Sequence, residues 1–285
     1  MPLIGFIGAG TVANALAISL SGKGYPVIAV SSRSFHSTEK LARLIDGCHA
    51  CSDNQEVADN AELIFITTPD DVITSVAAQV EWHPGHSVVH CSGADSADIL
   101  EPASKAGALV GVFHPLQTFV IARQAMDNIP GTTFAIEAEE PLLGMLKDMA
   151  TALEGHCVEI KAGDRVVYHA AAVFACNYLV TLVKLATDLW HTFGIPQEQA
   201  IRSLMPLLRG TINNIDAIGI PHCLTGPIAR GDAGTIKKHL SALQKAAPKL
   251  VSTYRELGLK TIPIARAKGK INDKQAKELG AMMSK

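Results

Sequence analysis

The sequence carries almost no excess charge of either sign. It has 25 Lys and Arg against 27 Asp and Glu, a formal net charge of −2 over 285 residues. Such a weak overall field gives no general attraction to nucleic acid or to an anionic membrane. We therefore expect neither of these as a partner, and instead a small-molecule substrate.

Leader segments and uninterrupted apolar runs are also lacking. A strand-like segment begins at Leu3 with no basic stretch before it, so we expect no signal peptide and a cytoplasmic location. The apolar stretch from Ala170 to Val183 is interrupted by Asn177 and Thr181. We interpret it as a buried helix rather than a membrane span.

The six cysteines follow neither a disulfide nor a zinc pattern. They are scattered, mostly in apolar stretches, which is typical of free cytosolic thiols. Cys48 and Cys51 have the spacing of a zinc-binding pair, but no second pair follows at a suitable distance. His83, His86 and His90 lead from a Pro-Gly turn into a strand. We therefore predict no metal site.

The first half of the chain alternates short apolar runs with helical patterns. We expect helices at Val12–Gly22, Asp70–Val80 and Pro141–Leu153, and strands at Leu3–Ile7, Val27–Ser31, Leu63–Thr67, Ser87–Cys91, Leu109–His114, Thr133–Ile136 and His156–Ile160. This alternation predicts an α/β fold with a doubly wound, mainly parallel sheet covered on both faces.

The pattern changes near Gly163. From Arg165 onward the periodicity is helical, with one long helix to His191 and breaks expected near Gly194, Gly219 and Gly258. We predict a Rossmann domain that binds NAD(P) over residues 1–162. An all-helical domain for substrate binding and dimerisation is expected over residues 163–285.

A dinucleotide-binding fingerprint follows the first strand. Gly8-Ala9-Gly10-Thr11-Val12-Ala13 matches Gly-x-Gly-x-x-Gly/Ala between a strand and a helix, as the motif requires. Gly8 permits the tight turn and Gly10 lets the backbone approach the pyrophosphate. Thr11 and Val12 open the helix whose free N–H groups would meet the phosphates.

The end of the second strand distinguishes between the two cofactors. NAD enzymes place Asp or Glu there to bind the ribose 2′-OH, whereas this chain has Ser31-Ser32-Arg33-Ser34. Hydroxyls and a guanidinium suit a 2′-phosphate, so Ser32 and Arg33 favour NADP(H). The alternative is a cluster that caps the next helix.

Later strand ends should line the same crevice, because ligands bind at the carboxyl ends of parallel strands. Thr68 and Pro69 follow one strand, Ser92 follows the next and His114 ends another. Thr68, Pro69 and Ser92 are candidate cofactor contacts, although Ser92 could simply begin a turn. His114 could contact the nicotinamide or substrate, or be a structural histidine fixed by Pro115.

The order of these motifs ahead of an all-helical second half resembles the 6-phosphogluconate dehydrogenase-like superfamily, which includes ketopantoate, pyrroline-5-carboxylate and prephenate enzymes. One branch is similar over essentially the whole chain. It comprises Rossmann-like NADP oxidoreductases with a helical C-terminal domain of unknown function, linked to ketopantoate reduction. The motifs that carry this resemblance are His114–Phe119, His169–Ala171 with Asn177–Tyr178, Leu224–Pro227 and Arg230–Asp232.

The resemblance implies catalytic residues but includes one departure. Ketopantoate reductases open their long helix with a catalytic Lys, followed by Asn four and eight residues later. Aligning the second Asn with Asn177 places Val173 at the first Asn and His169 at the Lys. Either His169 acts as the acid, with Asn177 on the same helix face, or the proton comes from elsewhere. A histidine bonded to the backbone near a helix start is the other interpretation.

In the second domain, Arg230 could pair with a substrate carboxylate and Thr225 could present a hydroxyl, whereas Asp232 fits a helix cap.

The leading hypothesis is an NADPH-dependent reductase of a small 2-oxo acid, with ketopantoate as the best guess. The alternatives are a prephenate-like or imine dehydrogenase and an NADP-binding sensor without activity. The resemblance also implies a homodimer.

Overall fold

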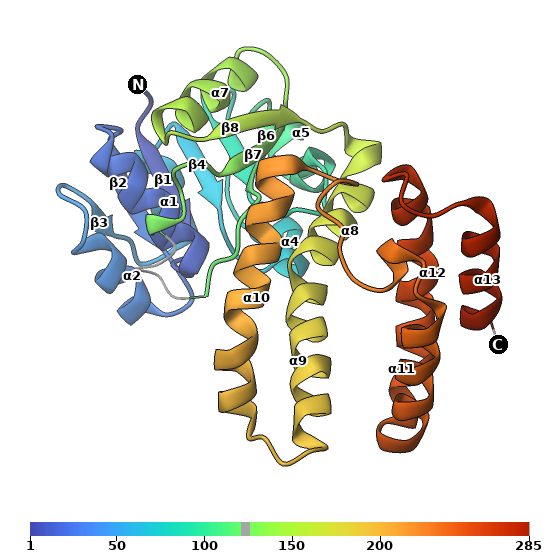
Figure 1. Cartoon of the computed structure of the whole chain (residues 1–285). Coiled ribbons are helices and arrows are strands. Elements are labelled where there is room, and N and C mark those ends of the chain that lie inside the picture. The colour runs from blue at the N-terminus through green and yellow to red at the C-terminus, as the bar shows by residue number, and fades with distance from the viewer. Residues whose placement is uncertain (121–125, 285) are drawn as a thin grey trace. The chain divides into compact units, whose positions relative to one another are not determined.

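A computed structural model describes residues 1–120 and 126–284 of the chain. These residues form two compact units, Met1–Cys176 and Asn177–Lys285. The first unit contains a sheet and its covering helices, and the second is entirely helical in its described part (Figure 1). The predicted α/β class with a helical C-terminal half is therefore confirmed.

The sheet of the first unit has eight strands in the order β3-β2-β1-β4-β5-β6-β7-β8. Strands β1 to β6 run parallel, β7 is antiparallel to β6, and β8 is parallel to β7. The strands are β1 (Ile4–Ile7), β2 (Val27–Ser31), β3 (His49–Ala50), β4 (Leu63–Ile66), β5 (Ser87–His90), β6 (Leu109–Pro115), β7 (Thr133–Ala138) and β8 (His156–Glu159).

Alternating strand residues supply two cores, one on each face of the sheet. On one face Phe6, Phe65, Phe113 and Phe134 form a row of buried rings, with neighbouring centroids 4.4–6.0 Å apart. Burying each ring stabilises the fold by about 1.5–3 kcal/mol. This face is covered by α1 (Thr11–Gly22), α2 (Phe35–Ala42) and α7 (Leu142–Ala152). The other is covered by α3 (Asn54–Asn60), α4 (Ile73–Ala77) and α5 (Glu101–Lys105).

The strand order reverses beside β1, and this reversal positions the site. From β1 the chain builds outward through β2 and β3, then returns to add β4 on the other side of β1. Ile7 of β1 is in register with Ile66 of β4, so Gly8 and Thr67 leave the sheet at the same level. A crevice at such a reversal is the usual ligand site of an open parallel sheet.

The second unit is built from helices that pack in two groups. Helices α9 (Asn177–His191) and α10 (Gln197–Ile218) lie side by side (Figure 1). Helices α11 (Ala233–Ala246), α12 (Val251–Ala267) and α13 (Asp273–Met283) share a core that includes Ile236, Ile262 and Leu279.

Three local expectations were wrong. Gly258 is not a break: it lies inside α12, where a Cβ would be 2.7 Å from Cε of Met283, so its small size allows α13 to pack closely. The long helix is divided at Cys176 into α8 (Arg165–Ala175) and α9. The helix expected over Asp70–Val80 is a 3₁₀ turn, η1 (Asp70–Val72), followed by the short α4.

The expected burial of Ala170–Val183 was also wrong. Val180 is 68% exposed and Leu182 is 42% exposed. Within the described chain, Ala162–His191 is the one helical segment long and apolar enough to cross a membrane by length and composition, which alone is a weak indication.

The boundary between the two units falls after Cys176, whereas the sequence pattern changes near Gly163. The difference is α8, which is helical like the second half but packs with the sheet. Its first residue, Arg165, is completely buried and contacts Ser92 in the loop after β5.

Candidate functional site

The glycine-rich turn after β1 has little room at Gly8. Gly8 has a φ of +114°, and a Cβ there would lie 2.8 Å from the backbone carbonyl of Thr67. The N–H of Gly8 donates to the carbonyl oxygen of Ser31 at 2.8 Å, and the Thr67 hydroxyl donates to the carbonyl oxygen of Gly8 at 3.1 Å. Only glycine fits this turn without strain, as the fingerprint predicts.

Gly10, by contrast, faces open space. A Cβ built on Gly10 would meet nothing within 4 Å, and Gly10 caps α1 without any side-chain hydrogen bond. The N–H groups of Thr11 and Val12 are therefore not capped by a side chain. A helix N-terminus of this kind attracts phosphate.

The Thr68 side chain supplies another unsatisfied group at the same edge of the sheet. Its hydroxyl oxygen is buried and lacks a hydrogen-bond partner among the described residues. Thr68 directly follows Thr67, which contacts Gly8. Open space over Gly10, free helix N–H groups and an orphaned hydroxyl together fit a bound dinucleotide.

The end of β2 combines a helix cap with groups suited to a 2′-phosphate. Ser34 caps α2 by accepting from the N–H of Ser37, as the alternative interpretation held. Ser32 donates to the carbonyl oxygen of Ser34 at 2.9 Å, and Arg33 is exposed beside it. The cap therefore uses Ser34 and leaves the Arg33 guanidinium at the surface.

Ser92 is buried and engaged within its own loop. Its hydroxyl oxygen lies 2.9 Å from Oδ2 of Asp70 and 2.8 Å from Oδ2 of Asp95, and it accepts from the Asp95 N–H at 3.2 Å. One hydroxyl proton cannot serve two carboxylates at once. Ser92 thus joins the loops after β4 and β5, and its predicted contact with a cofactor stays a prediction.

Two histidines and a tyrosine meet beside Gly93. Nδ1 of His114, on β6, is 2.8 Å from the hydroxyl oxygen of Tyr168, on α8. The rings of His114 and His169 are 6.3 Å apart between centroids. A Cβ on Gly93 would lie 2.6 Å from Cδ2 of His169 and 2.9 Å from Nε2 of His114. Helix α8 and strand β6 therefore bring these side chains together beside the loop that follows β5.

A buried arginine supports the cluster. Nη2 of Arg165 donates to the carbonyl oxygen of Ser92 at 3.0 Å, and Nη1 lies 3.6 Å from Oε2 of Glu137. Nε and Nη1 have no hydrogen-bond partner within the described residues. Arg165, Tyr168 and His169 follow i, i+3 and i+4 spacing, so they lie on one face of α8.

Burial sets the protonation states around this arginine. Burial, the positive charge of Arg165 and the neighbouring His169 and His90 lower the pKa of His114 to about 4. Burial raises the pKa of Tyr168 to about 12. At neutral pH His114 is therefore a neutral imidazole and Tyr168 an intact phenol.

The remaining predicted residues belong to the second unit. Asn177 begins α9 and is exposed, and Thr225 and Arg230 are exposed on the segment that precedes α11. Their catalytic and substrate-binding roles stay predictions. The prediction for Asp232 is confirmed, because its carboxylate caps α11 by accepting from the N–H of Thr235 at 2.9 Å.

The residues predicted from the sequence do not include Arg165, Tyr168, Glu137 or the carboxylates beside Ser92. The i, i+3, i+4 spacing from Arg165 to His169 was readable, but only the fold shows that this face meets β5 and β6. Glu137 gave no signal, because it lies on an ordinary strand, β7.

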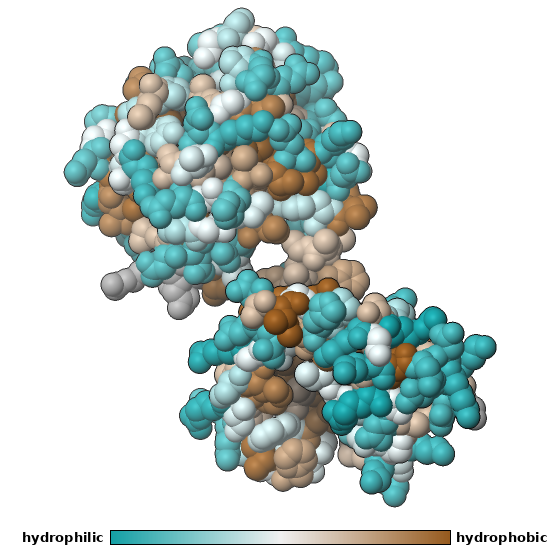
Figure 2. All heavy atoms as spheres, turned by 45° about the horizontal axis from the view of Figure 1, so that its top comes forward, coloured by the Kyte–Doolittle hydropathy of each residue, from teal (hydrophilic) through white to brown (hydrophobic). Residues whose placement is uncertain are grey.

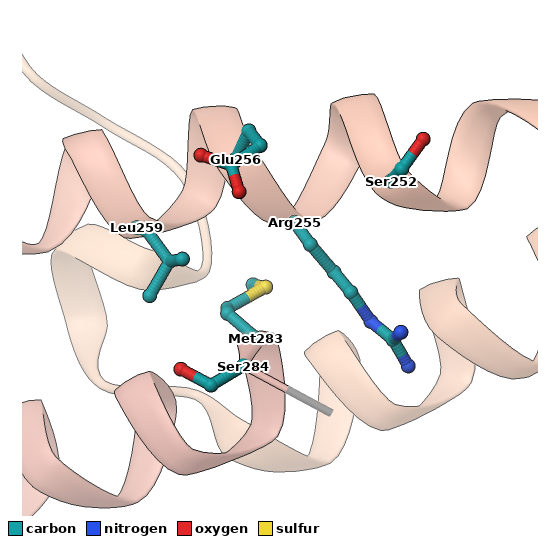
Figure 3. Close-up of a pocket in the computed structure, with 6 residues that line it drawn as sticks. All are labelled: Ser252, Arg255, Glu256, Leu259, Met283 and Ser284. Carbon is teal, nitrogen blue, oxygen red and sulfur yellow. The ribbon is translucent and has the colours of Figure 1, made fainter.

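Metal-binding groups and cavities among the described residues give no further support to this site. Within residues 1–120 and 126–284, no three His, Cys, Asp or Glu side chains are grouped so that they could hold a metal ion. A cavity of about 400 Å³ lies in the second unit, where side chains of α12 and the end of α13 line it (Figure 3). None of the predicted site residues lines that cavity.

Comparison with known families divides the chain in a similar way. Residues 2–115 match the family described as a Rossmann-like domain, and residues 132–261 match a domain of unknown function, DUF2520. The first unit thus has a Rossmann-like fold, and the match to the second family begins next to β7 of that unit. No protein of curated function matches the chain.

Solved structures resemble the chain over nearly its whole length. A candidate NADP oxidoreductase from Bacteroides fragilis is 26% identical, with 92% of this chain and 98% of that one covered and a TM-score of 0.72. A protein from Thermotoga maritima is 25% identical, with 94% and 100% covered and a TM-score of 0.74. A reductive aminase from Aspergillus terreus in complex with NADPH shares the fold at 14% identity, with 100% and 93% covered and a TM-score of 0.63.

Proposed function

We propose that this chain is an NADP(H)-dependent oxidoreductase. The observation that carries the proposal is the turn at Gly8–Gly10, which leaves open space and uncapped N–H groups at the sheet's reversal point. Ser32 and Arg33, without an acid between Ser31 and Ser34, favour the 2′-phosphate. The likeness to the Bacteroides fragilis protein supports the same cofactor. When bound, NADPH would supply a hydride.

Our leading substrate class is a small 2-oxo acid, with ketopantoate as the best single guess. Reduction of a ketone requires one proton at the developing alkoxide, and His169 beside Gly93 is our candidate donor. Arg230 is the candidate partner for the substrate carboxylate, and Thr225 is a further candidate substrate contact. Asn177 stays a candidate catalytic residue.

Imine reduction is the second candidate. It is favoured by the shared fold with the Aspergillus terreus reductive aminase and with a Plasmodium falciparum pyrroline carboxylate reductase, which has NADP bound. In both reactions the hydride adds to carbon, and the candidates differ in the heteroatom bonded to that carbon, an oxygen in one case and a nitrogen in the other.

NADPH oxidation over a panel of 2-oxo acids, including ketopantoate, and of cyclic imines separates the candidates. We expect turnover with one or more 2-oxo acids. Turnover restricted to imines would favour the second candidate. A separate assay of NADP+ reduction with prephenate covers the oxidative direction, and turnover restricted to it would favour a dehydrogenase of that kind. Tight NADPH binding without turnover on any substrate would favour a sensor.

Replacing His169 tests the proton donor. His169→Ala should lower kcat by about 10²–10⁴ and leave NADPH affinity nearly unchanged. His169→Lys, which restores the residue found at the aligned position in ketopantoate reductases, should retain part of the activity. His156→Ala is the matched control, because His156 is exposed on the edge strand β8. Near-normal turnover of His169→Ala would remove His169 from the chemistry.

We also propose that the chain forms a homodimer through α9 and α10. Val180 is 68% exposed, Leu207 is 66% exposed, and Ile212 and Ile215 are exposed on the same pair of helices. Apolar side chains reach the molecular surface among hydrophilic ones (Figure 2). Exposed apolar surface of this extent usually marks an interface, and a second copy offers the same surface in return.

Light scattering after size exclusion should give twice the chain mass. Val180→Lys combined with Leu207→Lys should shift the protein toward the monomer, whereas a Glu39→Lys control on α2 should not. A wild-type monomer that sediments with lipid vesicles would contradict the dimer and favour a membrane-associated helix.

A further inference from the structure

The contact between Tyr168 and His114 joins a side chain of α8 to one of β6. The hydroxyl oxygen and Nδ1 are 2.8 Å apart, and the two rings meet edge to face with centroids 5.7 Å apart. Tyr168 keeps its phenolic proton, because burial raises its pKa to about 12. That proton needs an acceptor, and among the described residues Nδ1 of the neutral His114 lies at hydrogen-bond distance from it.

The direction of this hydrogen bond decides what His114 offers on its other side. A neutral imidazole has one N–H and one bare nitrogen. If Nδ1 accepts from Tyr168, the hydrogen must reside on Nε2. Nε2 is the atom that faces Gly93, where a Cβ would lie only 2.9 Å from it and 2.6 Å from Cδ2 of His169.

We propose that Tyr168 is a positioning residue that holds His114 as a neutral Nε2–H donor, directed beside His169 at the oxygen of a carbonyl substrate. This inference rests on the proposed function and narrows its substrate class. A carbonyl oxygen accepts a hydrogen bond from Nε2–H. A protonated imine presents its own N–H to the same donor, so the arrangement disfavours it.

The charged groups around His114 keep it neutral over a wide pH range. Arg165, His169 and His90 surround the imidazole, and each lowers its pKa beyond the effect of burial. Tyr168 contributes a neutral hydroxyl. A neutral donor of this kind polarises a carbonyl without giving up its proton, which leaves proton transfer to His169.

The tautomer can be measured directly by ¹⁵N NMR on the full chain labelled at its imidazole nitrogens, without cofactor. His114 is assigned by the signals that disappear in His114→Asn. We expect Nε2–H with a hydrogen-bonded, unprotonated Nδ1 from pH 8 to pH 5.5, and a shifted Nδ1 signal in Tyr168→Phe. An Nδ1–H tautomer, or protonation above pH 6, would overturn the proposal.

Kinetics give a second, independent readout. Tyr168→Phe should lower kcat with a carbonyl substrate by roughly two- to tenfold and leave the KM for NADPH unchanged. The matched control is Tyr254→Phe, which removes a similar hydroxyl contact to His239, at 2.9 Å, in the second unit. An unchanged kcat in Tyr168→Phe would refute the positioning role. If the tautomer is as expected but no carbonyl is reduced, the proposed function fails and the tautomer assignment stands.

Discussion

Replacing Arg165 by Met should destabilise the Rossmann-like unit strongly. Arg165 is completely buried, donates to the carbonyl oxygen of Ser92 at 3.0 Å, and supplies the cation next to Glu137 at 3.6 Å. Loss of the charged hydrogen bond costs about 1.5–3 kcal/mol. Glu137 is then left as a largely buried acid without its cation, so we expect a total loss of about 3–5 kcal/mol in the free energy of unfolding.

A double variant separates the two contributions. Glu137→Gln keeps an oxygen that can accept from the N–H of Ala97, which Glu137 now binds at 3.0 Å, but removes the unpaired charge. Arg165→Met with Glu137→Gln should therefore be more stable than Arg165→Met alone by about 1–3 kcal/mol. Urea unfolding of the single and double variants at pH 7.5 measures both differences.

The pH dependence of the single variant has a defined sign. Burial already raises the pKa of Glu137, and removal of Arg165 should raise it further. A folded-state pKa above the unfolded value means that the folded chain binds the proton more readily. The penalty of Arg165→Met should therefore be largest at neutral pH and shrink as the pH falls. A loss below about 1 kcal/mol, or a double variant no better than the single one, would refute this account of the buried pair.

Three further predictions concern the same unit. Burial lowers the pKa of His90 and of His114 to about 4 in the folded chain, so the unfolded chain binds protons more readily than the folded one. The free energy of unfolding should therefore fall as the pH drops from about 6.5 to about 4. In urea titrations, His114→Asn should make this dependence on pH weaker. Gly8→Ala should lower the melting temperature, because Gly8 has a positive φ that alanine adopts only with strain. Gly10→Val should keep a normal melting temperature but lose NADPH binding in a fluorescence titration. The opposite pattern would contradict the roles assigned to the two glycines. Wild-type protein should bind NADPH more tightly than NADH, and Arg33→Asp should flatten or reverse this preference; equal affinities in the wild type would contradict the 2′-phosphate assignment.

Much of the fold was predictable because period-two and helical patterns are local properties. The strands from Ile4 to Glu159 and the turn at Gly8 were identified from such patterns, whereas β3, with two residues, was too short to give one. The antiparallel placement of β7 was not predicted, since strand direction depends on how the chain crosses the sheet.

The candidate site was predictable at the glycine-rich turn and less so at the histidines. His114 and His169 were selected as candidates, but their proximity at Gly93 depends on α8 packing against the ends of β5 and β6. Arg165 was not selected, because a charged residue at a helix start is usually solvated. Gly258 misled the helix assignment, since its role is close packing with Met283 rather than chain termination.

The most direct test of the central claim follows deuterium from NADPH into product. The protein is incubated with NADPH that carries deuterium at both C4 positions of the nicotinamide and with the panel of 2-oxo acids and cyclic imines, and the products are examined by mass spectrometry. An NADP(H)-dependent carbonyl reductase should give a 2-hydroxy acid that carries one deuterium at the former carbonyl carbon, with much less product in His169→Ala. Unlabelled material from every carbonyl and imine offered, despite tight NADPH binding, would contradict the enzymatic function.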